Sequence, residues 1–590
     1  MTASKPRITN LVELFQQSVD RFAERRAFGW QRGREWQYIT YAELDAMVAR
    51  ARAALAQLGV GRGDRVAIVC ENRLEWVVLA QATFQRRAIF VPMSEAQHDG
   101  ELKYILGDSG AKACFVATSS VATRVATLRE DLLDLHHVIP IEGGDSQTSW
   151  TGLLASAGQS LVSARMPLPS DIAMLMYTSG TTGEPKGVRL SHQNLSSNAS
   201  ALSDMRDFGS DPRCLAVLPW SHVFGGCVEL NLALALGSTV AICRNPDQFF
   251  QELPRVRPTM LYGVPRIWQL IYHDLQRELA REPEMSRQLF VHGVRLRAKQ
   301  RRSEQLSLSE RVTLNLAEKL VIGKLKGRLG GSLRLAFSGA APLSVEIAEF
   351  MHSIGITIHE GYGLTESSGS STSNPTGAVR FGSVGKPLLG TTIAIERRFT
   401  GHDPREGEVV IYGPGVMEGY QNQPEETARV LGTDGGLRTG DLGYLDTDGY
   451  LYITGRVKEL YKLNNGRYVA PAPLEEKLKL SPFVSNCMVY GAGQPYNVAL
   501  IVADVPALQR YFAGELREVR TLLTDRRVRR LFEDEILKHS REFRTFELVR
   551  SFWLEVEPFS RENGMLTSSF KLRRDRVRER YEGKLLSLYG

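Results

Sequence analysis

The order of elements predicted between Thr40 and Ala117 constrains the fold more than any other feature of this 590-residue chain. Apolar residues at helical spacing run from Thr40 to Gly59 and predict a helix. Strand, helix, strand, helix and strand are then predicted in turn from RVAIVC, LEWVVLAQATFQ, AIFVPM, LKYILGDSG and ACFVA. This alternation is typical of parallel sheets covered by helices, and similar strand patterns recur in LAVLP, STVAIC and TMLYGVP. We therefore predict an α/β fold class.

The remaining patterns divide the chain, which is too long for a single core. Residues 268–328 are charged and helix-periodic, with Leu314, Ala317, Val321 and Leu325 on one face, so we predict a helical insertion. Short strands and Gly/Pro turns predict a β-rich subdomain over residues 382–455. We expect a large N-terminal domain of helix-covered sheets (1–455) and a small, mobile α+β C-terminal lid domain (456–590).

Composition excludes several classes of protein. Apolar residues make up 43% and charged residues 24%, which is ordinary for a globular chain. The six cysteines are scattered without a CxxC pair, so we expect buried free thiols in a reducing compartment. The first residues lack the pattern of a secretory signal, and the apolar stretch from Cys214 to Cys243 is too polar for a membrane span. A soluble, cytoplasmic protein is expected.

Positive charge is concentrated in two places. The net charge is +7, and residues 266–328 alone hold 14 Lys/Arg against 7 Asp/Glu. The last twenty residues hold 7 basic and 3 acidic side chains. Such patches can meet nucleic acid, anionic lipid or a phosphorylated ligand, or can be solvated helix faces. No RNA-binding motif or zinc-finger spacing accompanies them, so we expect no nucleic-acid partner.

The segment YTSGTTGEPKGV, from Tyr177 to Val188, is the strongest indication of chemistry. Glycines let a backbone approach phosphate oxygens, hydroxyl side chains add donors, and Lys186 adds a positive charge. The spacing differs from that of a Walker A loop. The segment therefore predicts a phosphate-binding loop whose members before the lysine are Thr178, Ser179, Gly180, Thr181, Thr182 and Gly183.

This segment resembles the signature loop of the adenylate-forming superfamily, which comprises acyl-CoA synthetases, peptide-synthetase adenylation domains and luciferases. The superfamily's other motifs are matched in order by LPWSHVFGG, SGAAPL, GYGLTES, LRTGDLGYLDTDGYLYITGR and ENGMLTSSFKLRR. The resemblance covers essentially the whole chain. It implies ATP, Mg²⁺ and coenzyme A as substrates and cofactors.

The resemblance also implies nucleotide-binding roles for residues that would be unremarkable alone. Lys186 would hold the leaving phosphates, and Glu366 would ligate Mg²⁺. Asp441 would accept the ribose hydroxyls, with Arg456 near the ribose and phosphate. Tyr362, with the turn around Gly339 and Ala340, would form the adenine platform, and the neighbouring Gly361, Gly363 and Thr365 would also bind the nucleotide. Outside these motifs the same residues would be read as a helix cap, a core tyrosine and a turn aspartate.

Further residues are implied around the acid and the second domain. His222 would lie beside the carboxylate and α-phosphate, although a histidine in an apolar setting is often only a core residue. Trp220 and Val264 would line the acyl pocket. Lys571 would neutralise charge on the adenylate, although Ser568 and Phe570 replace the usual proline and glycine before it. The superfamily's hinge falls at Lys458.

The substrate class rests on the helical insertion, the KLKGRLGG run and the NNG loop, which resemble long-chain fatty acyl-CoA synthetases. We expect a fatty acid to be activated to acyl-AMP with release of pyrophosphate and then transferred to coenzyme A. The basic insertion suits an anionic membrane surface, with the enzyme peripheral on the inner membrane face. The alternatives are a fatty acyl-AMP ligase that loads an acyl carrier protein, and a non-catalytic relative that binds the same ligands.

Overall fold

The computed structural model describes residues 8–145, 148–158, 162–178, 184–205, 208–302, 304–397, 405–512, 523–560, 563–567 and 571–590. The chain forms two compact units. The larger unit comprises Met1–Ala340, Ala348–Ile393 and Ile411–Leu437. The smaller unit comprises Ala341–Ile347, Ala394–Val410 and Arg438–Gly590. The predicted α/β class, with a large and a small domain, is confirmed. The predicted boundary at residue 455 stays a prediction.

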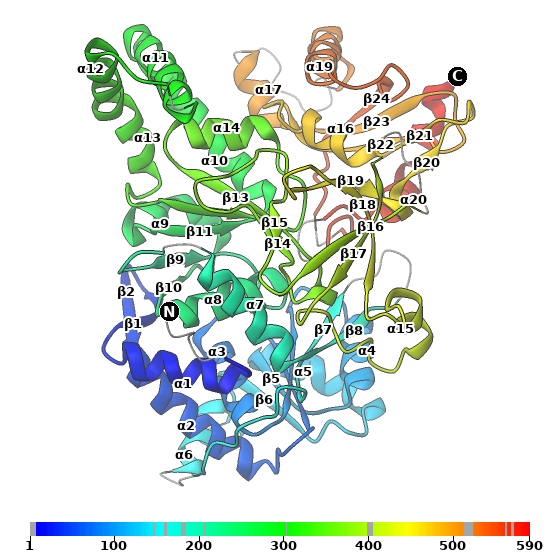
Figure 1. Cartoon of the computed structure of the whole chain (residues 1–590). Helices are drawn as coiled ribbons and strands as arrows, with labels where there is room; N and C mark the ends of the chain where they lie inside the picture. The colour runs from blue at the N-terminus through cyan, green and yellow to red at the C-terminus, as the bar shows by residue number, and fades with distance from the viewer. Residues whose placement is uncertain are drawn as a thin grey trace. The chain divides into compact units, whose positions relative to one another are not determined.

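A six-stranded sheet forms the first layer of the larger unit (Figure 1). Its strands in spatial order are β6 (His137–Glu142), β5 (Ala111–Thr118), β3 (Arg65–Val69), β4 (Ile89–Met93), β7 (Ile172–Thr178) and β8 (Lys186–Ser191). All neighbours pair in parallel except β7 and β8, which form an antiparallel hairpin. The parallel pairing predicted from the alternating patterns is therefore confirmed.

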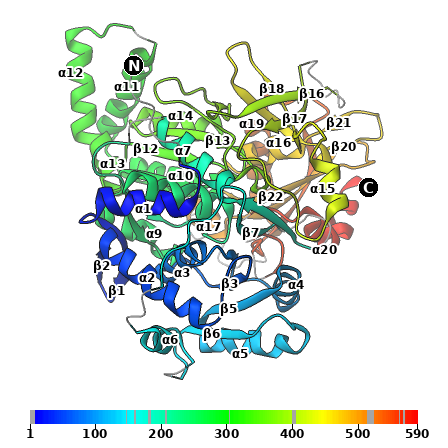
Figure 2. The ribbon, with the colours of Figure 1, turned by 60° about the horizontal axis from the view of Figure 1, so that its bottom comes forward.

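The helices of this part of the chain pack against the sheet or, for the first two, mainly against other helices. They are α1 (Leu11–Phe22), α2 (Tyr41–Gln57), α3 (Leu74–Gln85), α4 (Asp99–Ser109), α5 (Ser119–Leu128), α6 (Trp150–Ala157) and α7 (His192–Asp204). Figure 2 shows α5 and α6 beside β6. Helix α2 begins with a capping box in which Thr40 and Glu43 satisfy each other's backbone N–H groups. Helix α4 ends at Gly110 with φ 60°, a conformation that favours glycine.

Two further sheets complete the larger unit. One has the order β2 (Glu35–Thr40), β1 (Arg26–Arg32), β10 (Thr239–Ile242) and β9 (Arg213–Ala216). The other has the order β11 (Met260–Gly263), β12 (Leu335–Ser338), β13 (Thr357–Tyr362), β14 (Thr372–Ser373) and β15 (Lys386–Pro387). The helices that accompany them include a π-helical turn, η2 (Phe224–Glu229), and α8 (Leu230–Leu236), α9 (Phe249–Val256) and α14 (Val345–Ser353).

The residues of the predicted helical insertion form a series of helices after β11. These are α10 (Pro265–Arg281), α11 (Glu284–Arg301), α12 (Leu308–Ala317), the π-helical turn η4 (Glu318–Ile322) and α13 (Gly323–Arg328). The four residues predicted to share one face, Leu314, Ala317, Val321 and Leu325, are all buried. Among the described residues, no helix is long and apolar enough to cross a membrane.

The predicted β-rich region contains a sheet with the order β16 (Thr392–Glu396), β17 (Gly407–Tyr412), β18 (Leu437–Leu445) and β19 (Leu451–Arg456). Helix α15 (Pro424–Val430) lies between β17 and β18 in sequence. The turn η6 (Val457–Glu459) and the short pair β20 (Tyr461–Lys462) and β21 (Tyr468–Val469) follow.

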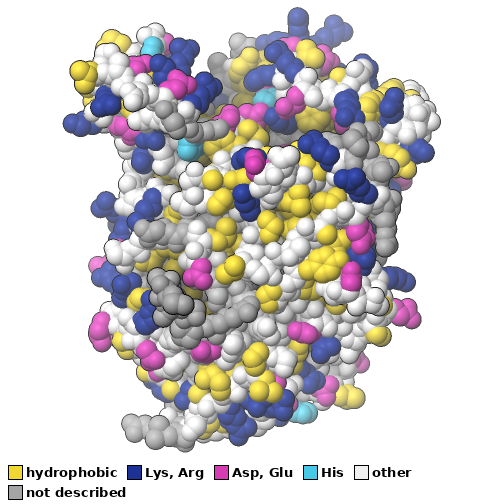
Figure 3. All heavy atoms as spheres, in the orientation of Figure 1, with side chains coloured by type: hydrophobic (Ala, Val, Ile, Leu, Met, Phe, Trp, Pro, Cys, Tyr) yellow, Lys and Arg dark blue, Asp and Glu magenta, His cyan; other side chains and the backbone are white. Residues whose placement is uncertain are grey.

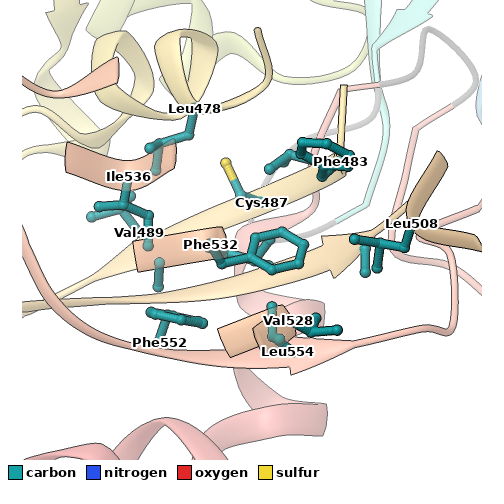
Figure 4. Packing of buried hydrophobic residues seen from close by; sticks show 14 of the residues in the cluster. Leu478, Phe483, Cys487, Val489, Leu508, Val528, Phe532, Ile536, Phe552 and Leu554 are labelled. Carbon is teal, nitrogen blue, oxygen red and sulfur yellow. The ribbon is translucent and has the colours of Figure 1, made fainter. Parts of the chain in front are cut away.

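The smaller unit has its own core around a three-stranded sheet, β22 (Val484–Tyr490), β23 (Asn497–Ala503) and β24 (Val549–Glu555). Its helices are α16 (Pro471–Leu478), α17 (Val505–Tyr511), α19 (Arg526–His539) and α20 (Arg574–Leu586). Figure 4 shows Phe532 of α19 packed among Cys487, Val489 and Phe552 of the sheet. All six cysteines are buried free thiols, as predicted.

Candidate active site

The predicted phosphate-binding loop joins two strands that run side by side. Thr178, at the end of β7, is the register partner of Lys186, at the start of β8. The two ends of the loop therefore lie next to each other at the same end of this strand pair. Its residues Ser179, Gly180, Thr181, Thr182 and Gly183 lie outside the described residues.

The strand before the loop is held by a buried tyrosine. The Tyr177 hydroxyl donates to Asp108 Oδ2 at 2.7 Å. Burial, and then the neighbouring Asp108 carboxylate, raise the pKa of Tyr177 above its ordinary value. The hydroxyl therefore stays protonated and remains a donor, which fixes the strand end from which the loop departs.

Lys186 contacts two residues that the sequence motifs did not single out. Its ammonium forms an ion pair with Glu426 of α15. It also lies 5.0 Å from the ring centroid of Tyr420, within the range of a cation–π interaction. Both partners of the ion pair are about one-quarter to one-third exposed, at 26% for Lys186 and 30% for Glu426. Such a pair contributes roughly 0–1 kcal/mol, so a polyanionic ligand can replace it.

Glu366, the predicted metal ligand, is positioned by the same tyrosine. The Tyr420 hydroxyl donates to Glu366 Oε1 at 2.8 Å, and the Met417 amide donates to the Glu366 carbonyl at 2.9 Å. Burial, and then the charge of Glu366, raise the pKa of Tyr420, so the phenol remains a donor. Tyr420 therefore links the predicted phosphate-binding lysine to the predicted metal-binding carboxylate.

The segment that carries Tyr420 is attached to the edge of β8. Three backbone hydrogen bonds join them: Glu418 N to Arg189 O (3.0 Å), Arg189 N to Gly419 O (3.0 Å) and Gln421 N to Gly187 O (2.7 Å). The Tyr420 amide also donates to Thr427 Oγ1 at 2.9 Å.

Sequence reasoning missed Tyr420 and Glu426 because they lie outside every motif quoted above. The sequence nevertheless contains residues that indicate a tight turn followed by the start of a helix at this point. Pro424 occupies the start of α15, as is favourable for a helix N-terminus, and Gly419 lies directly before the tyrosine. Gly419 has φ 118° and faces Thr427, so this turn requires glycine.

The predicted adenine site gathers at the carboxyl ends of β12 and β13. These strands pair in parallel with Ser338 opposite Glu360, so Gly339 follows opposite Gly361. Side-chain atoms would have little space here: a Cβ on Gly339 would lie 3.4 Å from the Gly361 carbonyl oxygen, and one on Gly363 only 2.6 Å from the Gly369 carbonyl oxygen.

The backbone is also strained at this edge. Ala340 has φ 71°, a left-handed conformation uncommon for a residue with a side chain. Tyr362, the last residue of β13, is half-buried. Thr365 begins the short turn that carries Glu366. The carboxyl ends of parallel strands are where open α/β sheets bind their ligands.

The predicted ribose residues form an ion pair in the smaller unit. Asp441 on β18 and Arg456 on β19 are register partners, and Arg456 Nε donates to Asp441 Oδ1 at 2.6 Å. Asp441 is buried, whereas Arg456 is 40% exposed. The Asp441 amide donates to Thr439 Oγ1 at 3.0 Å. The pair presents a fixed carboxylate and an accessible guanidinium from adjacent strands.

The predicted acyl-pocket residues lie in the larger unit. His222 is half-buried, and its Nδ1 accepts from the Phe224 amide at 3.3 Å. Trp220 is fully buried and packs edge-on against Trp76 with ring centroids 5.7 Å apart. Its amide donates to Asn72 Oδ1 at 2.8 Å. Val264, which precedes α10, is half-buried.

The two remaining predicted residues lie in the smaller unit. Lys458, the predicted hinge, is exposed within η6. Lys571 is exposed, and its amide donates to Thr567 Oγ1 at 3.0 Å. The roles of both residues stay predictions.

Comparison with protein families decides the class of this chain. A family described as "AMP-binding enzyme" matches residues 15–421, and "AMP-binding enzyme C-terminal domain" matches residues 459–525. The chain belongs to the AMP-binding enzyme family. The predicted membership of the adenylate-forming superfamily is thereby confirmed.

Relatives and solved structures agree with this family. The long-chain-fatty-acid–CoA ligase FadD15 of Mycobacterium bovis is 31% identical over 94% of this chain and 93% of its own length. The peroxisomal long chain acyl-CoA synthetase 7 of Arabidopsis thaliana is 28% identical over 99% and 87%. The adenylation domain of a carboxylate reductase from Mycobacterium chelonae shares the fold, with a TM-score of 0.80 at 23% identity, over 99% of this chain and 92% of that one.

Proposed function

We propose that this AMP-binding enzyme is an acid–thiol ligase that activates a long-chain fatty acid. ATP and the acid would form acyl-AMP and pyrophosphate, and the acyl group would then pass to the thiol of coenzyme A with release of AMP. The names of full-length relatives at about 30% identity support the substrate class. The motif residues described above support the first reaction.

The observation that carries this proposal is that one side chain, Tyr420, contacts both Lys186 and Glu366. A carboxylate must attack the α-phosphorus of ATP, although both groups are negatively charged. Positioned positive charge and correct alignment are therefore the main means of lowering the barrier. Lys186 would leave Glu426 to hold the phosphates that depart as pyrophosphate, while Tyr420 keeps Glu366 oriented toward the same place.

Mg²⁺ is the metal that this donor set would accept. The described residues contain no group of three or more His, Cys, Asp or Glu side chains that could form a protein-only metal cage. Mg²⁺ typically binds through one or two carboxylates together with substrate phosphates and water, which fits a lone Glu366. When bound, it would neutralise charge on the phosphate oxygens.

The remaining predicted residues complete the proposal. Asp441 would accept the ribose hydroxyls, and Arg456 would contact the ribose or phosphate. His222 would lie beside the acid's carboxylate, with Trp220 and Val264 along the acyl chain. Lys571 would approach the adenylate oxygens in the first reaction, and rotation at Lys458 would then move the residues that follow it so that the thiol can react.

The decisive assay measures both half-reactions with purified protein. ATP–pyrophosphate exchange that depends on a long-chain acid tests adenylate formation, and AMP release on addition of coenzyme A tests thioester formation. Absence of exchange with every acid from acetate to long-chain and aryl acids would contradict the first reaction. AMP release with holo-acyl carrier protein but not with coenzyme A would favour the carrier-loading alternative.

We also propose an anionic membrane surface as the place where the enzyme meets its acid, on the cytoplasmic side. A long-chain fatty acid partitions into bilayers. The excess of positive charge over residues 266–328 matches the sign of anionic headgroups.

A further inference from the structure

The helical insertion exposes a line of large apolar side chains that its own packing leaves uncovered. We call this line the outer stripe: Leu308, Val312, Leu316 and Leu320, which are 82%, 59%, 46% and 52% exposed. Residues four apart share one face of a helix, so the stripe runs about 18 Å along α12 and η4. The opposite face is buried through Leu314, Ala317 and Val321.

Contacts on the inner face of the hairpin formed by α11 and α12 are sufficient to hold its two helices together. The helices approach so closely that a Cβ on Gly293 would lie 2.7 Å from Ala317 Cβ. Leu296, Leu306 and Leu314 form the apolar cluster between them, and Arg297 pairs with Glu318 across the gap. The outer stripe is therefore not needed to hold the hairpin together.

The hairpin is exposed within its own unit. Figure 1 shows α11 and α12 projecting from α13, and Figure 3 shows apolar and basic side chains together on this projection. An apolar stripe of this length on a charged surface indicates an interaction site.

Unpaired cations flank the stripe. Every carboxylate in residues 266–328 forms an ion pair with a cation of the same region; they are Asp274, Glu278, Glu282, Glu284, Glu304, Glu310 and Glu318. Arg295, Arg311 and Lys319 are exposed and have no carboxylate partner within the described part of the chain. Arg311 and Lys319 each lie one helical turn from a stripe residue. The surface therefore combines apolar side chains with uncompensated positive charge.

We propose that the outer stripe inserts into the boundary between headgroups and acyl chains of a bilayer that contains anionic lipid. Arg311 and Lys319, each of which directly precedes a stripe residue, contact the lipid phosphates along one side of the stripe. An apolar face bordered by cations is the chemistry of helices that lie in a membrane interface. This inference rests on the proposed function, because a long-chain fatty acid is a substrate that the bilayer itself supplies.

The positive charge around the outer stripe favours an anionic bilayer over a second copy of the chain as the partner of this surface. A second copy of the chain would bring two positively charged hairpins together, which Coulomb repulsion opposes. An anionic bilayer instead attracts the cations and accepts the apolar side chains. The inserted surface would hold the enzyme at the membrane without a spanning helix.

The test is co-sedimentation of the full-length protein with two kinds of vesicle, phosphatidylcholine alone and phosphatidylcholine with phosphatidylglycerol in equal parts. We expect binding to the anionic vesicles to be stronger and to weaken as salt is added. The double substitution Leu316→Ser with Leu320→Ser should lower the partition coefficient at least tenfold. The double substitution Arg311→Ser with Lys319→Ser should lower it about fivefold per cation, and only on anionic vesicles.

The matched control is Leu133→Ser, which removes an apolar side chain that is 89% exposed in the segment before β6. It should bind vesicles as the unmodified protein does. Equal binding to both vesicle types, or no loss in the stripe variant, would overturn the inference. So would light scattering that shows a dimer dispersed by the stripe substitutions in the absence of lipid.

AMP release with octanoate, a water-soluble acid, should be unchanged in all these variants. This assay separates the two proposals. Absence of acid-dependent AMP release in the unmodified protein, with long-chain acids as well as with octanoate, counts against the proposed reaction, whereas normal AMP release without vesicle binding counts against the outer stripe.

Discussion

The Tyr420 hydroxyl donates a 2.8 Å hydrogen bond to Glu366 while its ring lies 5.0 Å from the Lys186 ammonium. One side chain therefore contacts both a cation suited to phosphate and a carboxylate suited to Mg²⁺. The relationship connects β8, the turn η5 (Thr365–Ser367) and the segment before α15. These parts lie far apart in the sequence. Three experiments on the site follow from these contacts and from the Asp441–Arg456 pair.

Tyr420→Phe should raise the KM for Mg·ATP about tenfold with a smaller change in kcat. The phenylalanine ring keeps its place near Lys186, but Glu366 loses a hydrogen bond to a charged group, worth about 1.5–3 kcal/mol. Pyrophosphate exchange at varied ATP concentration measures the effect. Tyr412→Phe is the control, because its hydroxyl donates to the exposed Asp434 side chain at 2.8 Å and not to Glu366. An equal effect in both variants would contradict the positioning role.

Glu426→Gln should lower the KM for ATP by up to about fivefold. The substitution removes the carboxylate that competes with phosphate for Lys186, and a partly exposed ion pair is worth roughly 0.2–1 kcal/mol. The neighbouring Glu425→Gln removes the same charge from an exposed position on α15 and should have no such effect. A raised KM in Glu426→Gln would show instead that Glu426 supports Lys186 in the ATP complex.

Asp441→Asn should raise the KM for ATP about tenfold to a hundredfold. A neutral amide accepts hydrogen bonds from ribose hydroxyls more weakly than a carboxylate does, and Arg456 loses its charged partner. Asp448→Asn, in the exposed turn between the same two strands, is the matched control. Calorimetric titration with AMP checks the affinity. Unchanged AMP binding in Asp441→Asn would exclude the ribose role.

Lys571→Ala should slow adenylate formation by about a hundredfold or more. Removal of a single group that stabilises transition-state charge typically costs this much. Thioester formation from supplied acyl-AMP should be far less affected, because that reaction no longer forms the new bond to the α-phosphate. Lys538→Ala, on the exposed side of α19, controls for loss of surface charge. Equal slowing of both half-reactions would argue for a structural role.

Buried His192 should make the fold sensitive to acid. Burial lowers its pKa to about 3, well below the value of about 6.5 expected in the unfolded chain. Below about pH 6.5 the unfolded chain binds a proton that the folded chain does not, so stability falls by up to about 1.4 kcal/mol per pH unit down to about pH 3. Thermal unfolding between about pH 7.5 and 5.5 measures this loss.

The loss should be smaller in His192→Asn than in the unmodified protein. The exposed His136→Asn variant should show the same pH dependence as the unmodified protein. An identical decline in all three proteins would mean that other groups account for the acid sensitivity.

Local patterns predicted the sheets and several site residues because their signals lie within short segments. The strands β3, β4 and β5 with helices α2, α3 and α4 follow from alternating strand and helix periodicity. Lys186 and Glu366 were found because each lies in a distinctive motif. The structure shows what links them, since Tyr420 lies 54 residues from Glu366 and a single tyrosine carries no pattern of its own.

The outer stripe escaped prediction for a different reason. Helical spacing predicted that Leu314, Ala317, Val321 and Leu325 share a buried face, which the structure confirms. A second apolar face on α12, through Leu308 and Leu316, gives the same kind of periodicity. Only the packing of α11 against one side decides which face remains in contact with solvent.

The hydrogen-bonded attachment of Glu418–Gln421 to β8 has a consequence for any truncated version of this enzyme. A fragment that stops before Gly413 would leave the outermost strand with open amide and carbonyl groups along Gly187–Arg189. The unpaired backbone groups of an exposed edge strand form hydrogen bonds with strands of other chains, which causes aggregation. The larger unit should consequently aggregate when expressed without this segment, even though every helix and strand of the six-stranded sheet is present.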